Sequence, residues 1–269
     1  MKFGIREFLL GAAVLCLSGA AVSSKAQNVL SAEEVVQRTL ERARHSEARG
    51  DTPDFNYTRL TLTEQLDSAG RVKERQERRY EVQFRDGVTR VLLLSINGHP
   101  PTDDERQQQA DNEKNLRKLL GPSRSSSGNA SDDLLTPDVA ARFQFTLVGV
   151  SELNGRRTCQ IAFEPKNPPP PERRLADRLL NRISGTVWID AEDFEIARAE
   201  VFLRSEVNLF GGVVASLKRL AYTIERTRVA DGVWFSTFST GDFQGRKLLE
   251  PAHIRTRSQS VNFRQPRTS

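Results

Sequence analysis

Three histidines are the first residues to test for chemistry, because imidazole is the commonest side-chain base and metal ligand near neutral pH. His45, His99 and His253 lie far apart, and none belongs to a paired-histidine or Cys/His motif. The acidic run Asp103-Asp104-Glu105 is the other metal candidate, but it fits the first turn of a helix, where the dipole favours negative charge. The sequence therefore predicts no metal site and no cofactor.

Motifs for nucleophilic catalysis and phosphate binding are also missing. The sequence has no G-x-S-x-G elbow, and Gly211-Gly212 lacks the lysine of a phosphate-binding loop, so it indicates a bend. The residues around this bend form an apolar loop tip that either contacts a membrane or partner or packs against a helix: Leu209, Phe210, Val213 and Val214. We predict no catalytic residue, and an exported enzyme using scattered carboxylates is the weakest function class.

The N-terminus has the pattern of a secretory signal. Lys2 and Arg6 precede an apolar run at 8–22, which is shorter than the roughly 20 residues that a membrane-spanning helix needs. Small residues at 24–26 predict cleavage after Ala26, and export to the periplasm. Cys16 lies within the apolar run, so Cys159 is the one cysteine of 27–269 and an internal disulfide is excluded. No second apolar stretch of that length follows, which predicts a soluble exported chain.

The charge balance excludes a nucleic-acid-binding surface. Of the 40 Lys and Arg and 35 Asp and Glu residues, three basic and one acidic fall in 1–26, which leaves 37 against 34. The C-terminal region is locally basic, with Arg255, Arg257, Arg264 and Arg267. A solvated strand edge and contact with an anionic membrane surface both fit this cluster.

Helix signals occur at four places. Ser31 and Glu34 form a capping box ahead of an apolar face that ends at Gly50. A charged helix is predicted at 102–120 as a surface cover, followed by a flexible loop at 121–133. Thr136-Pro137 predicts a short helix, and 172–183 predicts another.

Alternating apolar and polar residues predict strands through the rest of the chain. Asp86-Gly87, Asn154-Gly155 and Asp231-Gly232 are hairpin turns between them. The segment 88–96 is apolar at successive positions, which predicts cover on both faces. About nine to eleven antiparallel strands with two or three helices predict an α+β fold, in which one long sheet curls and the helices cover one face.

This order of elements resembles the periplasmic lipoprotein-carrier (LolA/LolB-like) fold and the outer-membrane lipoprotein-sorting proteins. The local match is 185–196, in which Trp188-Ile189-Asp190 ends a strand and Phe194 begins the return, and the hairpin 153–161 is similar to the preceding one of the family. The resemblance implies an incomplete β-barrel that holds acyl chains in an apolar cavity. It thus implies one domain at 27–269, not an enzyme, whose partner is a lipid or acylated protein.

Residues at alternating strand positions are the candidates to line that cavity, and ordinary core packing is the competing interpretation for each. They are Leu60, Leu62, Tyr80, Val82, Phe84, Phe145, Leu147, Ile161, Phe163, Val187, Ile189 and Phe235. An envelope sensor or protein-interaction domain of the same fold, without lipid cargo, is the alternative function. An exposed edge strand would favour that alternative.

Overall fold

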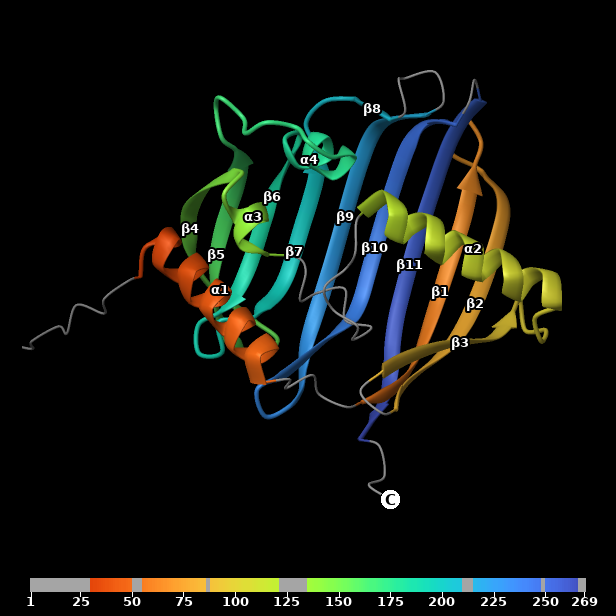
Figure 1. Ribbon diagram of the computed structural model, residues 1–269, viewed down its shortest axis with the longest axis horizontal. Helices are drawn as coiled ribbons and strands as arrows, with labels where there is room; N and C mark the ends of the chain where they lie inside the picture. The colour runs from red at the N-terminus through yellow and green to blue at the C-terminus, as the bar shows by residue number, and fades with distance from the viewer. Residues whose placement is uncertain are drawn as a thin grey trace, which may run out of the picture.

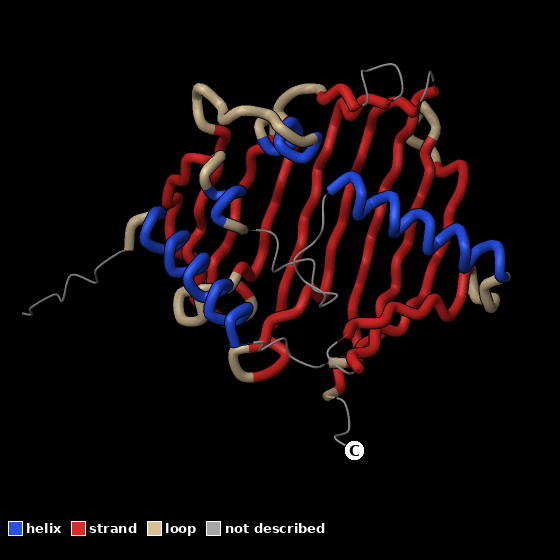
Figure 2. The backbone as a smooth tube through the Cα atoms, in the orientation of Figure 1, coloured by secondary structure: helices blue, strands red, loops and turns tan. Residues whose placement is uncertain are grey.

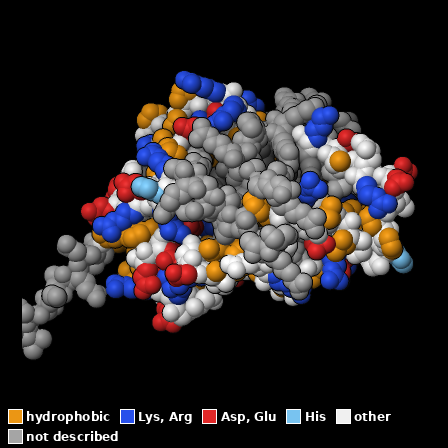
Figure 3. Space-filling view, turned by 60° about the horizontal axis from the view of Figure 1, so that its bottom comes forward, with side chains coloured by type: hydrophobic (Ala, Val, Ile, Leu, Met, Phe, Trp, Pro, Cys, Tyr) orange, Lys and Arg blue, Asp and Glu red, His pale blue; other side chains and the backbone are white. Residues whose placement is uncertain are grey.

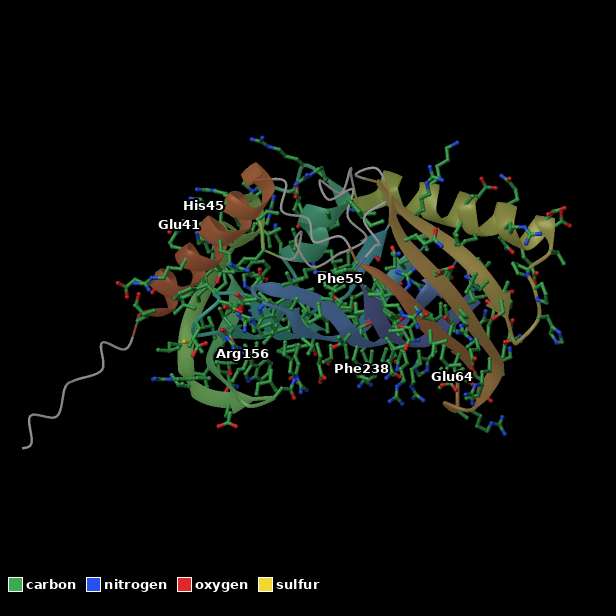
Figure 4. All side chains as sticks on the ribbon, turned by 90° about the horizontal axis from the view of Figure 1, so that it is seen from below. Glu41, His45, Phe55, Glu64, Arg156 and Phe238 are labelled. Atoms are coloured by element: carbon green, nitrogen blue, oxygen red, sulfur yellow. The ribbon has the colours of Figure 1, made fainter. Side chains whose placement is uncertain are left out.

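One antiparallel sheet of 11 strands dominates the computed structural model, which describes residues 30–49, 55–85, 88–120, 135–209, 215–247 and 250–265 (Figure 1). The order is β3-β2-β1-β11-β10-β9-β7-β6-β5-β4, and β8 pairs with β9. Because β3 and β4 stand at opposite ends of this order, the sheet is open, and it curls into a trough (Figure 4). The fold is the expected one: mainly antiparallel, incompletely closed and covered by a few helices.

The bounds of the elements agree closely with the sequence pattern. The strands are β1 (Asn56–Leu66), β2 (Val72–Arg85), β3 (Val88–Ile96), β4 (Phe143–Leu153), β5 (Arg156–Pro165), β6 (Ile183–Asp190), β7 (Ile196–Leu203), β8 (Val207–Leu209), β9 (Ala215–Ala230), β10 (Val233–Lys247) and β11 (Glu250–Arg264). The helices are α1 (Ala32–Arg49), α2 (Asp103–Leu120), α3 (Pro137–Ala140) and α4 (Leu175–Leu180). The predicted loop at 121–133 lies outside the described residues.

Local signals fixed the helix starts. Ser31 N–H donates to Glu34 Oε2 at 2.8 Å and Glu34 N–H donates to Ser31 Oγ at 3.2 Å, which is the predicted capping box. Thr136 caps α3 through Val139 N–H. The helix predicted at 172–183 is wrong in length: α4 covers only Leu175–Leu180, because Ile183 pairs with Leu203 as the first residue of β6.

The two edge strands of the sheet are separated in the chain by α2 and α3. The chain leaves the sheet at the edge strand β3, passes through α2 and α3, and re-enters at the opposite edge, β4. The first strand then pairs with the last, with Leu60 opposite Gln259. The hairpins were predictable from turn residues, whereas this pairing of β1 with β11 joins segments far apart in the chain.

All four helices lie on the concave side of the sheet (Figures 1 and 2). Helix α1 lies over the end formed by β4 and β5, and α2 crosses the other half, over β11 and β1. Glu64 and Phe238 point from the convex side, away from the helices (Figure 4). Side chains on alternate strand positions therefore face either the helices or the outside.

The prediction that 88–96 is covered on both faces is wrong. Strand β3 is an edge strand, and its Val91, Leu92 and Leu94 are 36%, 43% and 41% exposed. An apolar run resembles a doubly covered central strand in sequence, but the position of a strand in the sheet order is a tertiary property.

Candidate functional site

One row of directly opposed residues runs across the whole concave face and changes character at its midpoint. From β4 to β3 it reads Leu147, Ile161, Val187, Ala199, Ile224, Ser239, Ser258, Thr61, Arg78 and Ile96. The first five are apolar and the next four are polar. Since opposed residues in an antiparallel pair share a face, the concave surface has an apolar half and a polar half.

Helix α1 fills the apolar half. Val35, Val36 and Leu40 of α1 are 0–4% exposed and form one cluster with Ile161 and Ile189, which are both fully buried. Phe145, Leu147 and Val187, also predicted to line the cavity, pack against the same cluster. These five strand residues are thus placed in close-packed core under α1 and not around an open space.

Cys159 belongs to this core as well. Its thiol is free and buried, and burial raises its pKa above the ordinary value. A neutral, enclosed thiol is a poor nucleophile, so the residue serves packing.

A second aromatic cluster holds two more of the predicted residues. Val82 and Phe235 pack with Phe55 and Tyr57, and the Phe235 ring lies 5.5 Å from that of Phe55. Burial raises the pKa of the Tyr57 hydroxyl. Phe55 lies inside the trough in Figure 4, so this cluster is on the concave face, at the end of the sheet beside the β9–β10 turn.

The remaining predicted residues are spread over other places. Tyr80 is buried on the concave face, and Phe163 packs edge-on against Phe143 at a centroid distance of 5.1 Å. Phe84 is half-buried near the end of β2. The structure does not bring the twelve residues into one cavity lining.

Leu60 and Leu62 correct the predicted set, because they face the convex side. Arg59 stands opposite Tyr80, so the next residue, Leu60, points to the other face, opposite Arg79. Strand alternation predicted which residues within β1 share a face, but the register between β1 and β2 decides which face is inside.

The apolar loop tip falls outside what can be described. Phe210, Val213 and Val214 are not among the described residues, and of Leu209 only the backbone at the end of β8 is described. Its role in membrane or partner contact stays a prediction.

A strip of half-buried residues lies on the floor of the trough, on the side of Ile224 away from the β9–β10 turn. Leu220 of β9, Phe243 of β10 and Ile254 of β11 are directly opposed in one row, and Tyr222 and Gly241 are opposed in the next. A Cβ atom at Gly241 would overlap the Phe243 ring, so glycine lets that ring lie across the strand. Leu220, Phe243 and Ile254 belong to neither cluster, whereas Tyr222 packs against the cluster under α1.

Helix α2 touches the polar half through polar side chains. Among its side chains that the structure describes, at 103–111 and 114, only Glu105 and Gln109 are half-buried and the others are exposed. Gln109 Oε1 accepts hydrogen bonds from Arg78 Nη1 at 3.2 Å and from the Tyr80 hydroxyl at 3.3 Å. Within the described side chains of α2, the link to the sheet is thus made by the hydrogen bonds of Gln109.

The charged residues form no metal site in the part of the chain described. Within it, no group of three or more His, Cys, Asp or Glu side chains is arranged so that it could hold a metal ion. No helix within the same ranges is long and apolar enough to cross a membrane. Positive and negative side chains are interspersed on the face shown in Figure 3.

Comparison with solved structures finds several similar chains at low sequence identity. The chain is similar to a LolA superfamily protein from Nitrosomonas europaea, at 11% identity and a TM-score of 0.30, over 89% of this chain and 96% of that one. It is also similar to a DUF1329 family protein from Desulfovibrio piger, at 14% identity and a TM-score of 0.32, over 86% and 92%. The lipoprotein LppX of Mycobacterium tuberculosis matches at 10% identity and a TM-score of 0.27, over 86% and 98%.

No protein-family model and no curated protein matches the sequence. Identities this low establish no residue-by-residue correspondence. The roles proposed below therefore rest on the contacts of this chain alone.

The Trp188-Ile189-Asp190 motif builds a charged turn and not a ligand site. The Asp190 carboxylate accepts two hydrogen bonds from Arg156, at 2.6 and 2.8 Å, and one each from the N–H groups of Glu192 and Asp193. Burial by itself raises the pKa of Asp190, but these hydrogen bonds outweigh it and hold the pKa below the usual value. The same interactions raise the pKa of Arg156.

Asp193 extends this network to the β9–β10 hairpin. Its carboxylate accepts from Trp234 Nε1 at 2.8 Å and pairs with Arg228 at 2.9 Å. Glu195 pairs with Arg42 of α1 at 2.8 Å and with the buried Arg226 at 2.6 Å. The turn therefore connects its own β6–β7 hairpin to the β4–β5 hairpin, to the β9–β10 hairpin and to α1, which gives the motif a structural role.

Sequence reasoning missed Arg59 and Arg78, the two cations of the polar half. Arg59 lies over the ring of Tyr80, with its guanidinium carbon 4.7 Å from the centroid. The signal available was the alternation in 58–66, which separates Arg59 from Leu60. That signal becomes useful only once the inner face is known.

Proposed function

We propose that the protein binds an amphiphilic lipid, or the lipid chains of an acylated protein, on the concave face of its sheet. The observation that carries the proposal is that half-buried apolar residues, Leu220, Phe243 and Ile254, share the concave face with the polar residues Ser239, Ser258, Thr61 and Arg78. A ligand with a hydrocarbon chain and a polar head matches such a surface, because each end then meets side chains of its own kind.

The floor strip takes the hydrocarbon chain. Leu220, Tyr222, Phe243 and Ile254 lie on three adjacent strands and keep part of their surface exposed. Burial of each methylene group against such a surface contributes about 0.8 kcal/mol. The α1 half, being filled by its own helix, instead gives the strip a rigid border.

Helix α2 acts as the cover over the polar head. Its described contacts with the floor are the hydrogen bonds of Gln109, and a hydrogen bond exchanged for water costs only about 1 kcal/mol net. A cover held in this way opens at low cost, unlike α1, whose displacement would expose a buried apolar face.

The site of action is the periplasm. Residues 1–26 direct export and are removed, and 27–269 act as one carrier or binding domain in envelope trafficking, without catalytic chemistry. Cell fractionation and N-terminal sequencing test this location: the protein is expected in the periplasmic fraction with Gln27 as its first residue. Recovery in the cytoplasm with Met1 retained would contradict it.

Native mass spectrometry of the purified protein, followed by organic extraction, tests the binding function. We expect a bound phospholipid or acylated species, and displacement by a fluorescent fatty-acyl probe. Phe243→Gln should weaken binding of the probe about tenfold, since part of an aromatic surface is lost. Phe202→Gln is the matched control, because Phe202 is 51% exposed and stands opposite Ala221, whose neighbour Tyr222 faces inward. A ligand-free protein that also ignores the probe would contradict the proposal.

A second candidate function, recognition of an envelope protein, is favoured by the edge strand β3. Its Leu92 and Leu94 are exposed on a strand whose outer backbone edge ends the sheet order, and such an edge accepts an added strand. Proline at Leu92 would abolish binding of a partner of this kind while leaving probe binding intact. Loss of probe binding in the same variant would tie β3 to the lipid site instead.

A further inference from the structure

Arg59 and Arg78 are diagonal neighbours on the concave face. Arg59 stands opposite Tyr80 and Thr61 stands opposite Arg78, so the two arginines lie on adjacent strands, two residues apart in register. Both side chains are half-buried, and α2 passes over this half of the sheet (Figure 1). Two cations are thus placed together in a partly enclosed position.

Neither guanidinium has a carboxylate partner within the described part of the chain. Elsewhere buried or half-buried arginines are paired: Arg156 with Asp190, Arg142 with Asp177 and Arg226 with Glu195. The Nε atoms of Arg59 and Arg78 are buried without a hydrogen-bond partner, as are those of Arg226 and Arg228, but the latter two arginines are paired with Glu195 and Asp193. A half-buried guanidinium without a counter-charge is costly, so the pair Arg59 and Arg78 indicates a site that an anion completes.

The acidic residues nearest the pair face the other way, and Glu74, which shares the concave face, is exposed and lies four residues before Arg78 on β2. Glu77 stands opposite Leu62 and Glu81 opposite Thr58, and both positions belong to the convex face. Hydroxyl groups surround the pair instead: Thr61 Oγ1 and Ser258 Oγ are 2.9 Å apart in the same cross-sheet row as Arg78. The local field is therefore positive, with neutral hydrogen-bond donors beside it.

We propose that Arg59 and Arg78 form a subsite for one phosphate or carboxylate group, with the hydroxyls of Thr61, Ser258 and Tyr80 as additional donors. Guanidinium groups suit this role because their fixed forks donate paired hydrogen bonds to planar or tetrahedral oxyanions. The subsite deepens the proposed function, on which it rests, by giving the polar head of the amphiphile a negative charge.

Gln109 of α2 competes with the anion. Its single Oε1 accepts from both Arg78 and Tyr80, so it holds the donors that the anion would use. Binding of an anion replaces this acceptor and releases α2 from the floor at that point. Head-group binding and opening of the cover are therefore coupled through one side chain.

Titration with three probes tests the subsite: inorganic phosphate, dispersed phosphatidic acid, and an uncharged fatty-acyl ester. The double variant Arg59→Gln/Arg78→Gln should bind phosphatidic acid at least about tenfold more weakly than the unaltered protein, with binding of the ester unchanged. Arg79→Gln is the matched control, because it removes the same charge from the neighbouring position on the convex face, and it should change affinity less than about twofold. Arg78→Lys should restore part of the loss.

Gln109→Ala supplies a test in the opposite direction, since removal of the competing acceptor should raise affinity for phosphatidic acid severalfold.

The three probes distinguish the sources of the anion. Tight binding of inorganic phosphate alone would assign the subsite to a free anion, whereas binding of both phosphate and the ester would assign it to a lipid head. Equal loss in Arg79→Gln and in the double variant would overturn the subsite while leaving the proposed function in place. Failure of every probe on the unaltered protein would remove both. Far-ultraviolet circular dichroism confirms that each variant is folded.

Discussion

The two halves of the concave face are built on one sheet but covered in different ways. Under α1 the row Leu147, Ile161 and Val187 meets Val35 and Leu40, and the interface is dry. Under α2 the continuation of that row is Ser258, Thr61 and Arg78, and Gln109 of the helix accepts a hydrogen bond from Arg78. The first half therefore stabilises the fold through apolar packing, whereas the second half carries the proposed ligand site.

Truncation of one side chain in each half tests this difference most directly. Ile161→Ala should lower the free energy of unfolding by about 4 kcal/mol, because a fully buried side chain is removed from packed core. Thr61→Ala should cost less than about 1 kcal/mol, because its half-buried hydroxyl loses one hydrogen bond. Urea denaturation measures both values, and equal losses would contradict a division of roles.

Removal of the charged turn beside α1 should have the next largest effect. Asp190→Asn should cost about 3 kcal/mol at pH 7, because Arg156 loses its one fully buried counter-charge and keeps only Glu192 at 3.0 Å and Asp193 at 3.7 Å. The folded pKa of Asp190 lies below its unfolded value, so the stabilisation is present above about pH 4 and is lost as pH falls through the folded pKa. The stabilities of the two proteins should therefore converge as pH falls below about 4, and a constant gap would refute the assignment.

The capping boxes at the starts of α1 (Ser31 with Glu34) and α2 (Thr102 with Glu105) allow a smaller, matched comparison. Ser31→Ala and Thr102→Ala each remove an N-cap hydroxyl, worth about 1 kcal/mol to its own helix. Because α1 is part of the core, we expect the Ser31 variant to lower the midpoint of global unfolding. The Thr102 variant should leave that midpoint unchanged and accelerate amide hydrogen exchange in α2 alone. A shared shift of the midpoint would show that α2 is integral to the fold.

The smallest expected effect is on stability in Gln109→Ala, at less than about 1 kcal/mol, since the donors it releases are within reach of water. Hydrogen exchange in α2 should nevertheless rise while exchange in α1 stays constant. Increased exchange in both helices would mean that the two covers open together.

Sequence alone fixed the elements of this protein and their local chemistry. Some features depend only on residues close together in the chain, and the sequence therefore predicted them correctly. They are the capping box at Ser31, the turn at Asn154-Gly155 and the alternation in β5. The overall class followed as well, because many consecutive hairpins with few helices leave one curled sheet as the solution.

The tertiary structure decided which face of each strand is inside and what covers it. Leu60 and Arg59 are adjacent, and only the register with β2 places the arginine under α2 and the leucine outside. The exposure of β3 and the filled state of the α1 half likewise depend on neighbours contributed by distant segments. Period-two alternation shows which residues of a strand share a face, but it does not show which face is inside. The pairing of β1 with β11 and the packing of α1 decide which face is inside.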